Sequence, residues 1–210
     1  WQTRIRYADL RIPRNLRRMP LPHGIKHAPM RRHRLVRTPN DRDELRVRER
    51  LQEFIFGTDE ETYEGVLASR ILRAGITIAA AETAAGTSVI QTLKGMEGSP
   101  TFFRVGLTVC DPKAASSLLP GCAFGDGGLA SPEAARALAE GVRRLAGTDV
   151  GLGISGLVAQ DTSQDHVLFV AMASDPGTNS LELKWPFALR FIENRMTKTA
   201  LDQIRKTVLH

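Results

Sequence analysis

The stretch Ala81–Ser88, AETAAGTS, combines one carboxylate, Glu82, with three small hydroxyl side chains, Thr83, Thr87 and Ser88. It follows an apolar run, residues 75–81, that has the length of a buried strand. Polar loops between a buried strand and a helix are where α/β proteins usually keep their chemistry. A threonine hydroxyl becomes a nucleophile only when a base activates it. The stretch is therefore a candidate active site or the remnant of one.

Other candidate sites carry weaker signals. The glycine-rich segment 121–131 lacks the Lys-Ser/Thr pair of a phosphate-binding loop, and we interpret it as a flexible turn. His23 and His27 lie four residues apart in a proline-rich segment without a third ligand, so we expect no metal site. Cys110 ends an apolar strand, and we interpret it as a small core residue rather than a nucleophile. We expect no cofactor.

Strands and helices alternate after residue 59, which is typical of an α/β domain. The clearest helix begins after Ser131 as N-cap, with Pro132 at its first position and Gly147 at its end. Near-continuous apolar runs at 76–81 and 150–155 predict central strands covered on both faces. We predict a three-layer α/β/α domain with a mixed sheet over residues 59–210. The predicted strands are 76–81, 102–110, 150–155, 167–173 and 181–185, and the predicted helices are 59–73, 85–93, 112–119, 132–146 and 189–209.

Three stretches carry a family resemblance: LASPEAARALAEGVRRLAGTDVGLGISG, residues 129–156; the ungapped stretch 98–119; and Arg195 with ALDQIRK at 200–206. On these stretches, residues 63–208 resemble the CinA C-terminal domain, the nicotinamide-nucleotide amidase family. The resemblance implies a CinA-like fold. It also implies hydrolysis of nicotinamide mononucleotide to the nicotinate nucleotide and ammonia by a Ser nucleophile, with a Tyr and a Lys as partners.

The site positions depart from that family pattern. Thr83 stands at the position of the nucleophilic Ser, Cys110 at that of the Tyr, and Ala115 at that of the Lys. The ligand loop keeps Glu82 and Gly86, while Ser155 and Gly156 begin a second loop whose later Gly and Pro are missing. Losing a general base alone costs about 10²–10⁴-fold in rate. We therefore expect a catalytically degenerate member, a pseudoenzyme without a small-molecule nucleotide partner.

The basic residues gather at the N-terminal end of the chain. Residues 1–50 hold 15 Lys and Arg against 5 Asp and Glu, a net charge of +10, whereas the rest carries −4. Five prolines between residues 13 and 39 disfavour regular structure. We expect an extended basic arm that is disordered alone, followed by a connector helix within 39–57. Residues 1–58 then form one region and residues 59–210 the domain.

Arginine forms bidentate hydrogen bonds with phosphate and stacks on bases, so this asymmetry favours an RNA partner. An acidic protein surface and an idle tail are the alternatives. The predicted RNA-binding residues are Arg4, Arg6, Arg11, Arg14, Arg17, Arg18, Lys26, Arg31, Arg32, Arg34 and Arg37.

Composition narrows the class of protein and the compartment in which we expect it. The 210 residues are 42% hydrophobic, yet no apolar run reaches the roughly 18–20 residues of a membrane span. Two cysteines make no disulfide framework, which fits a reducing compartment. Mitochondrial ribosomes contain recruited, inactive enzyme domains with basic extensions, and this chain is similar to that pattern. We expect a structural subunit in the mitochondrial matrix that binds rRNA and neighbouring proteins. The alternatives are a diverged amidase and an accessory subunit of an organellar protein complex.

Overall fold

The computed structural model describes ten stretches of the chain, which divides into two compact units, Trp1–Val66 and Leu67–His210. The described residues are 4–7, 27–28, 34–37, 55–58, 61–83, 88–125, 128–157, 166–175, 177–185 and 192–208. Among them, no helix is long and apolar enough to cross a membrane.

The first unit contains a small antiparallel sheet. Its strands are β1 (Arg4–Tyr7), β2 (His27–Ala28), β3 (Arg34–Arg37) and β4 (Ile55–Thr58), in the order β2-β3-β1-β4. The expectation of an arm without regular structure is therefore wrong at these residues, which pair with one another. The predicted connector helix is also wrong at its end, because residues 55–57 belong to β4, which pairs with β1. Residues 38–54 lie outside the described part of the chain.

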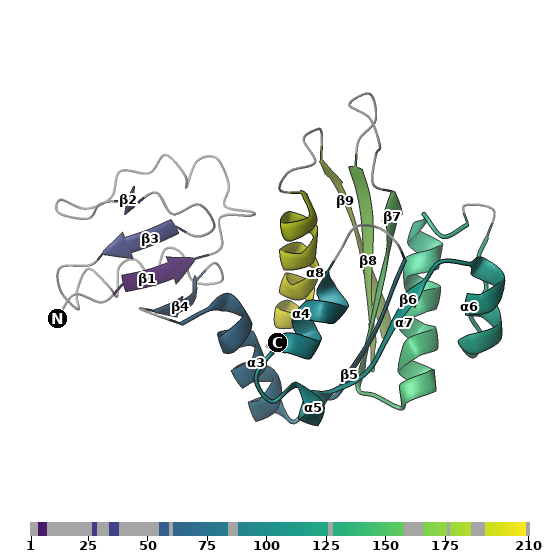
Figure 1. Cartoon of the computed structure of the whole chain (residues 1–210), viewed down its shortest axis with the longest axis horizontal. Coiled ribbons are helices and arrows are strands. Elements are labelled where there is room, and N and C mark those ends of the chain that lie inside the picture. The colour runs from purple at the N-terminus through teal and green to yellow at the C-terminus, as the bar shows by residue number, and fades with distance from the viewer. Residues whose placement is uncertain are drawn as a thin grey trace. The chain divides into compact units, whose positions relative to one another are not determined.

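The second unit is built on a five-stranded mixed sheet (Figure 1), as predicted. The strand order is β6-β5-β7-β8-β9, with β5 parallel to both β6 and β7 and the remaining pairs antiparallel. The strands are β5 (Ile78–Thr83), β6 (Phe103–Val109), β7 (Val150–Leu157), β8 (His166–Ser174) and β9 (Gly177–Trp185). The apolar runs predicted as central strands supply β5 and β7, which lie side by side inside the sheet.

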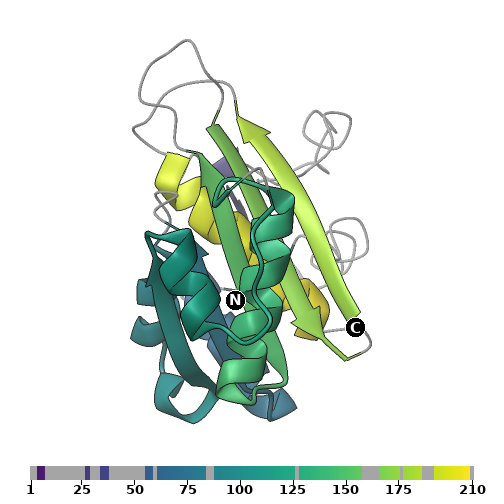
Figure 2. The same cartoon turned by 90° about the vertical axis from the view of Figure 1, so that its right-hand side faces the viewer.

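Helices cover both faces of this sheet, which confirms the three-layer prediction. The helices α6 (Pro112–Leu118) and α7 (Pro132–Ala146) lie on one face, toward the viewer in Figure 2. The helices α4 (Val89–Gly95) and α8 (Ile192–Val208) lie on the other. The short α5 (Ser99–Phe102) leads into β6, and α3 (Tyr63–Ala74) precedes β5.

The α7 helix has the ends that its sequence predicts. The Ser131 hydroxyl accepts a hydrogen bond from Ala134 N at 3.1 Å, Pro132 occupies the first helical position, and Gly147 closes the helix at φ +60°. Its backbone lies directly on β7, because a Cβ added at Gly153 would be 1.9 Å from the carbonyl oxygen of Ala135. Glycine at this position is therefore what allows α7 to approach the sheet so closely.

Between α7 and the sheet lies a cluster of small and branched apolar side chains, here called the α7-side core. Its buried members are Ala79, Ala81, Val109, Ala115, Leu119, Cys122, Leu138 and Val142. Burial raises the pKa of the Cys122 thiol, so this cysteine behaves as a protonated core residue. The core holds β5, β6, α6 and α7 together beneath the carboxyl ends of the parallel strands.

Candidate active site

The candidate site residues meet where β5, β6 and β7 end. Thr83 is the last residue of β5 and pairs with Val109, the last residue of β6, so Cys110 directly follows the partner of Thr83. Glu82 pairs with Ile154 on β7, one residue before Ser155. The structure thus brings Glu82, Thr83, Cys110 and Ser155 to one edge of the sheet, whereas Gly86 lies outside the described residues.

Thr83 is buried, with 5% of its surface exposed. Strand alternation places it on the same face as Ala79 and Ala81, toward the α7-side core. Its Oγ1 has no hydrogen-bond partner among the residues that the structure describes. No described group therefore accepts a hydrogen bond from this hydroxyl, which stands where the resemblance implies a nucleophile.

The position where the resemblance implies a lysine is closed by apolar packing. Ala115 lies on α6 and is 2% exposed within the α7-side core, next to Leu119 and Val109 in the same cluster. A lysine ammonium there would need a polar partner to offset its desolvation. The local surroundings of Ala115 are those of a structural core residue.

Cys110 is exposed, so its interpretation as a core residue is wrong. The reason is local: β6 ends at Val109, and Asp111 already caps the next helix by accepting a hydrogen bond from Ala114 N at 2.8 Å. The chain therefore turns away from the sheet at Cys110. A thiol also lacks the reach and hydroxyl of the tyrosine that the resemblance implies here.

Ser155 has a structural role that sequence reasoning missed. Its hydroxyl, fully buried, donates to the Ser131 carbonyl oxygen at 2.7 Å and accepts from Ser131 N at 3.2 Å. These two bonds fasten the end of β7 to the first residue of the α7 cap. The next residue, Gly156, has no room for a side chain, because its Cβ would be 2.3 Å from the Val167 carbonyl oxygen on β8. Both residues are thus accounted for by the fold.

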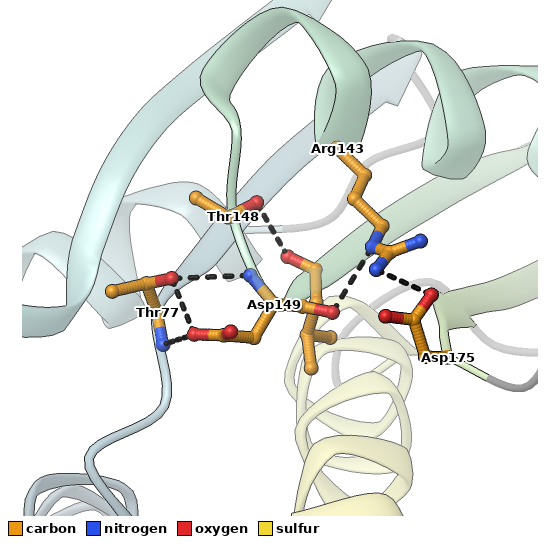
Figure 3. Close-up of polar contacts among 6 residues, drawn as sticks. Thr77, Arg143, Thr148, Asp149 and Asp175 are labelled. Carbon is orange, nitrogen blue, oxygen red and sulfur yellow. Dashed lines mark hydrogen bonds and ion pairs between the residues drawn. The ribbon is translucent and has the colours of Figure 1, made fainter.

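A second polar cluster, which sequence reasoning also missed, lies at the opposite ends of β5 and β7 (Figure 3). Asp149 Oδ2 accepts hydrogen bonds from Thr77 N at 2.8 Å and from Thr77 Oγ1 at 2.6 Å, and Asp149 N donates to Thr77 Oγ1 at 3.1 Å. The Thr77 hydrogen bonds hold the pKa of Asp149 below its usual value. The amide and hydroxyl of Thr77 and the amide of Asp149 all take part in these bonds, which indicates a structural clasp.

Arg143 extends this clasp to the neighbouring turn. Its Nε donates to the Asp149 carbonyl oxygen at 3.0 Å, and its Nη2 forms an ion pair with Asp175 Oδ1 at 2.9 Å. Within the described residues, no group of three or more His, Cys, Asp or Glu could hold a metal ion.

Four of the predicted RNA-binding positions lie on described strands: Arg4 and Arg6 on β1, and Arg34 and Arg37 on β3. The register places Arg4 opposite Arg37. The other predicted positions lie outside the described residues: Arg11, Arg14, Arg17, Arg18, Lys26, Arg31 and Arg32.

Comparison with known proteins shows which family the domain resembles. The family model described as "CinA C-terminal domain" matches residues 60–208. A CinA-like protein of Syntrophus aciditrophicus is 32% identical over 166 residues, covering 76% of this chain and 39% of that protein. A CinA-like protein of Geobacter sulfurreducens is 28% identical over 169 residues, covering 78% of this chain and 41% of that protein. The chain thus spans about two fifths of the length of these relatives.

Solved structures share the fold. A CinA superfamily protein from Klebsiella pneumoniae 700603 superposes with a TM-score of 0.57 at 17% identity, covering 69% of this chain and 96% of that one. A competence or damage-inducible protein from Enterobacter asburiae gives 0.56 at 19% identity, covering 70% and 98%. Because the family model matches residues 60–208, more than half of the chain, the chain belongs to the CinA C-terminal domain family.

Proposed function

We propose that this chain is a non-catalytic CinA-family subunit of an RNA-containing assembly, and that it binds RNA through residues 1–50. Two observations together carry the non-catalytic part: the candidate nucleophile has no hydrogen-bond partner, and an alanine packed in the core stands where the resemblance implies a lysine. Thr83 Oγ1 has no partner among the described residues, and Ala115 is sealed within the α7-side core.

The loss affects several catalytic roles together. A hydroxyl nucleophile needs a base to remove its proton and a group to stabilise the developing charge. At the positions where the resemblance implies these groups, the chain has an alanine methyl and an exposed thiol, Cys110. Each lost role costs orders of magnitude in rate. Ser155 is accounted for by its hydrogen bonds to Ser131 and Gly156 by its close packing on β8, so these two residues give no independent support to catalysis.

The positive part of the proposal rests on charge. A net charge of +10 within 50 residues attracts a polyanion, while the rest of the chain, at −4, does not. The antiparallel pairing of β1 and β3 brings four arginine positions onto two adjacent strands. Phosphate contacts by arginines of this kind position a protein on RNA without reading its sequence. We expect little base specificity, because Trp1 and Tyr7 are the main aromatic residues that accompany the arginines.

Within this proposal, the assembly is the mitochondrial ribosome in the matrix, and the partners are rRNA and neighbouring ribosomal proteins. The support is the combination of a degenerate enzyme domain with a basic extension. The test is cosedimentation of the tagged chain with large ribosomal particles from mitochondria, in a gradient where ribonuclease treatment releases it. Cosedimentation with a respiratory complex that resists ribonuclease would favour the accessory-subunit alternative instead.

The RNA-binding part is tested by the salt dependence of affinity. Each phosphate neutralised adds about 0.7–0.9 to the slope of log K against log salt. If half of the ten arginines at positions 4–37 bind phosphate, the slope is about −3.5 to −4.5. The measurement is fluorescence anisotropy of a labelled duplex RNA with the full chain across a salt series.

A charge-matched pair of variants separates the basic segment from general electrostatics. The test variant replaces Arg4, Arg6, Arg34 and Arg37 with Gln. The control replaces four exposed basic residues of the second unit with Gln: Arg73, Lys94, Arg104 and Lys113. Both change the net charge by the same amount. We expect the slope to flatten markedly only in the test variant. Equal flattening in both would reject a dedicated RNA-binding segment.

The second candidate function is a diverged amidase that uses Thr83. The observation in its favour is the same unpartnered hydroxyl, since a buried polar group without a partner is costly and often marks a reacting site. It requires a base from a ligand or from residues outside the described part. Ammonia release from nicotinamide mononucleotide distinguishes it from the non-catalytic proposal.

A further inference from the structure

The register of β1 and β3 assigns their residues to the two faces of the small sheet in the first unit. Four consecutive pairs run without a bulge: Arg4 with Arg37, Ile5 with Val36, Arg6 with Leu35, and Tyr7 with Arg34. Directly opposite residues of an antiparallel pair share a face, and successive residues of a strand alternate between faces. The register shift of this sheet lies in the pairing of β1 with β4, so it leaves these four pairs undisturbed.

One face of this sheet, here called the arginine face, contains three of the four arginines of β1 and β3. Arg4 and Arg6 lie two residues apart on β1, and Arg37 lies opposite Arg4. Directly opposite positions are about 4.5–5.5 Å apart, and positions two residues apart on a strand are about 6.8 Å apart. The remaining described residues of this face carry no charge: Ala28, Leu35 and Gly57. The arginine face thus concentrates three positive charges on neighbouring positions.

The opposite face is mainly apolar. Its apolar and aromatic residues are Ile5, Tyr7, Val36 and Ile55, and its polar residues are His27, Thr58 and Arg34. The fourth arginine, Arg34, therefore lies on this face, opposite Tyr7. Antiparallel sheets with one apolar and one polar face commonly bury the first and expose the second. We expect the arginine face to be the one that is open to a ligand.

The positive charge of the arginine face has no counter-charge within the strands of its own sheet. None of the residues of β1, β2, β3 and β4 is Asp or Glu. Like charges directly opposite each other destabilise a strand pair, so Arg4 and Arg37 are unfavourable neighbours in the free protein. An anion bound on this face removes that repulsion, and a row of anions also reaches the position of Arg6. The register therefore favours a polyanionic ligand.

We propose that the arginine face binds the phosphate backbone of duplex RNA and that Arg34 takes no part in this contact. The inference rests on the proposed function, which it narrows from residues 1–50 to one face of β1 and β3. Proteins that bind unpaired RNA stack its bases on aromatic side chains. The described part of the arginine face has no aromatic residue, and Tyr7 lies on the opposite face. A duplex also presents more phosphates per unit length than a single strand.

The test compares two variants of the full chain that each remove one positive charge from β3. Arg37→Gln removes it from the arginine face, and Arg34→Gln removes it from the opposite face. Affinity is measured by fluorescence anisotropy of a labelled RNA duplex across a salt series. Loss of one phosphate contact flattens the slope of log K against log salt by about 0.9 and weakens binding about 5- to 10-fold at about 0.1 M salt. We expect this change for Arg37→Gln, whereas Arg34→Gln should weaken binding less than about 2-fold.

The other two arginines and a charge-preserving variant complete the series. Arg4→Gln and Arg6→Gln should each behave like Arg37→Gln. Arg37→Lys retains the charge and should retain most of the affinity, because lysine also binds phosphate. Removing the Arg37 charge relieves the repulsion with Arg4, so thermal denaturation of the free Arg37→Gln chain should show no loss of stability. Weaker RNA binding without weaker folding separates a contact from a structural role.

The possible failures are distinguishable. Equal weakening by Arg34→Gln and Arg37→Gln, in chains with unchanged circular dichroism, overturns the arginine face and leaves the proposed RNA binding standing. Binding of an unpaired oligouridine as tightly as a duplex of the same length overturns the choice of duplex RNA. Polyglutamate that displaces the duplex at equal charge concentration indicates an acidic protein surface instead. A full chain without measurable affinity for either RNA overturns the proposed function and this inference together.

Discussion

The two ends of the β5–β7 strand pair each have a threonine hydroxyl, and these two hydroxyls differ in their hydrogen bonding. At the amino ends, Thr77 Oγ1 donates to Asp149 Oδ2 and accepts from Asp149 N. At the carboxyl ends, Thr83 Oγ1 is buried and has no partner among the described residues. A hydrogen-bonded group contributes to stability, whereas an unpaired buried one costs about 1–3 kcal/mol. The hydroxyl at the amino end thus stabilises the fold. The buried, unpaired hydroxyl at the carboxyl end lowers its stability, and packing does not explain why it is there.

The carboxyl end is not uniformly without hydrogen bonds, because the Ser155 hydroxyl forms two of them there. This serine ties β7 to the α7 cap through both the N–H and the C=O of Ser131. The comparison therefore separates residues at one edge into those that the fold needs and those that it does not. Mutations that remove a hydroxyl should have opposite signs at Ser155 and Thr83.

The largest effect is expected for Ser155→Ala. It leaves the buried N–H of Ser131 without its partner, and the Ser131 carbonyl oxygen keeps only the hydrogen bond from Ala135 N, so the free energy of unfolding should fall by about 2–4 kcal/mol. Urea denaturation followed by circular dichroism measures it. Ser155→Thr is the matched control, since it retains the hydroxyl and should lose less. A loss below about 0.5 kcal/mol in the alanine variant would show that Ser155 does not fasten the cap.

A smaller loss is expected for Asp149→Ala at the amino end. The carboxylate accepts two hydrogen bonds from Thr77 at an exposed site, so we expect a loss of about 1–2 kcal/mol at pH 7. Asp175→Ala is the control, because it removes only the ion pair of an exposed carboxylate with Arg143 and should cost less than about 1 kcal/mol. Equal losses in the two variants would contradict the clasp.

The clasp also predicts a pH dependence. Thr77 lowers the pKa of Asp149 in the folded state, so the stabilisation is complete above the unfolded-state pKa of about 3.9. It is lost as the pH falls through the lower folded-state pKa. The difference in unfolding free energy between wild type and Asp149→Ala should therefore be constant near neutrality and shrink in acid. A difference that grows as the pH falls would have the wrong sign for this account.

The smallest change, with the opposite sign, is expected for Thr83→Val. This isosteric substitution removes an unpaired buried hydroxyl, so stability should stay the same or rise by up to about 1 kcal/mol. Thermal and urea denaturation measure it, and Thr77→Val, which breaks the clasp, provides a destabilised comparison. A clear destabilisation by Thr83→Val would mean that the hydroxyl has a partner in the folded protein.

Local sequence patterns predicted most helices and strands of the second unit. They could not predict contacts between residues that are far apart in the sequence. The α7 helix was predictable because its cap, first-turn proline and terminal glycine act within a few residues of one another. Ser155 bonds a residue 24 positions away and Thr77 one 72 positions away, and no local pattern encodes such pairs. The strand β4 was missed for the same reason, since its partner β1 lies about fifty residues earlier.

The site positions were predictable from the resemblance, but their surroundings were not. The sequence placed Thr83, Cys110 and Ala115 in one site, and the parallel pairing of β5 with β6 brings the first two to one edge. Cys110 is exposed because β6 ends before it and Asp111 already caps the next helix. Apolar periodicity does not show at which residue a strand gives way to a helix.

The central claim, that the carboxyl end has lost its chemistry, is tested most directly by ammonia release from nicotinamide mononucleotide. The full chain and its Thr83→Ala variant are assayed side by side at high enzyme concentration, with a coupled ammonia assay. The account predicts no release above background and no difference between the two proteins. Turnover of about one per second, typical of a working enzyme, that disappears in Thr83→Ala would contradict it.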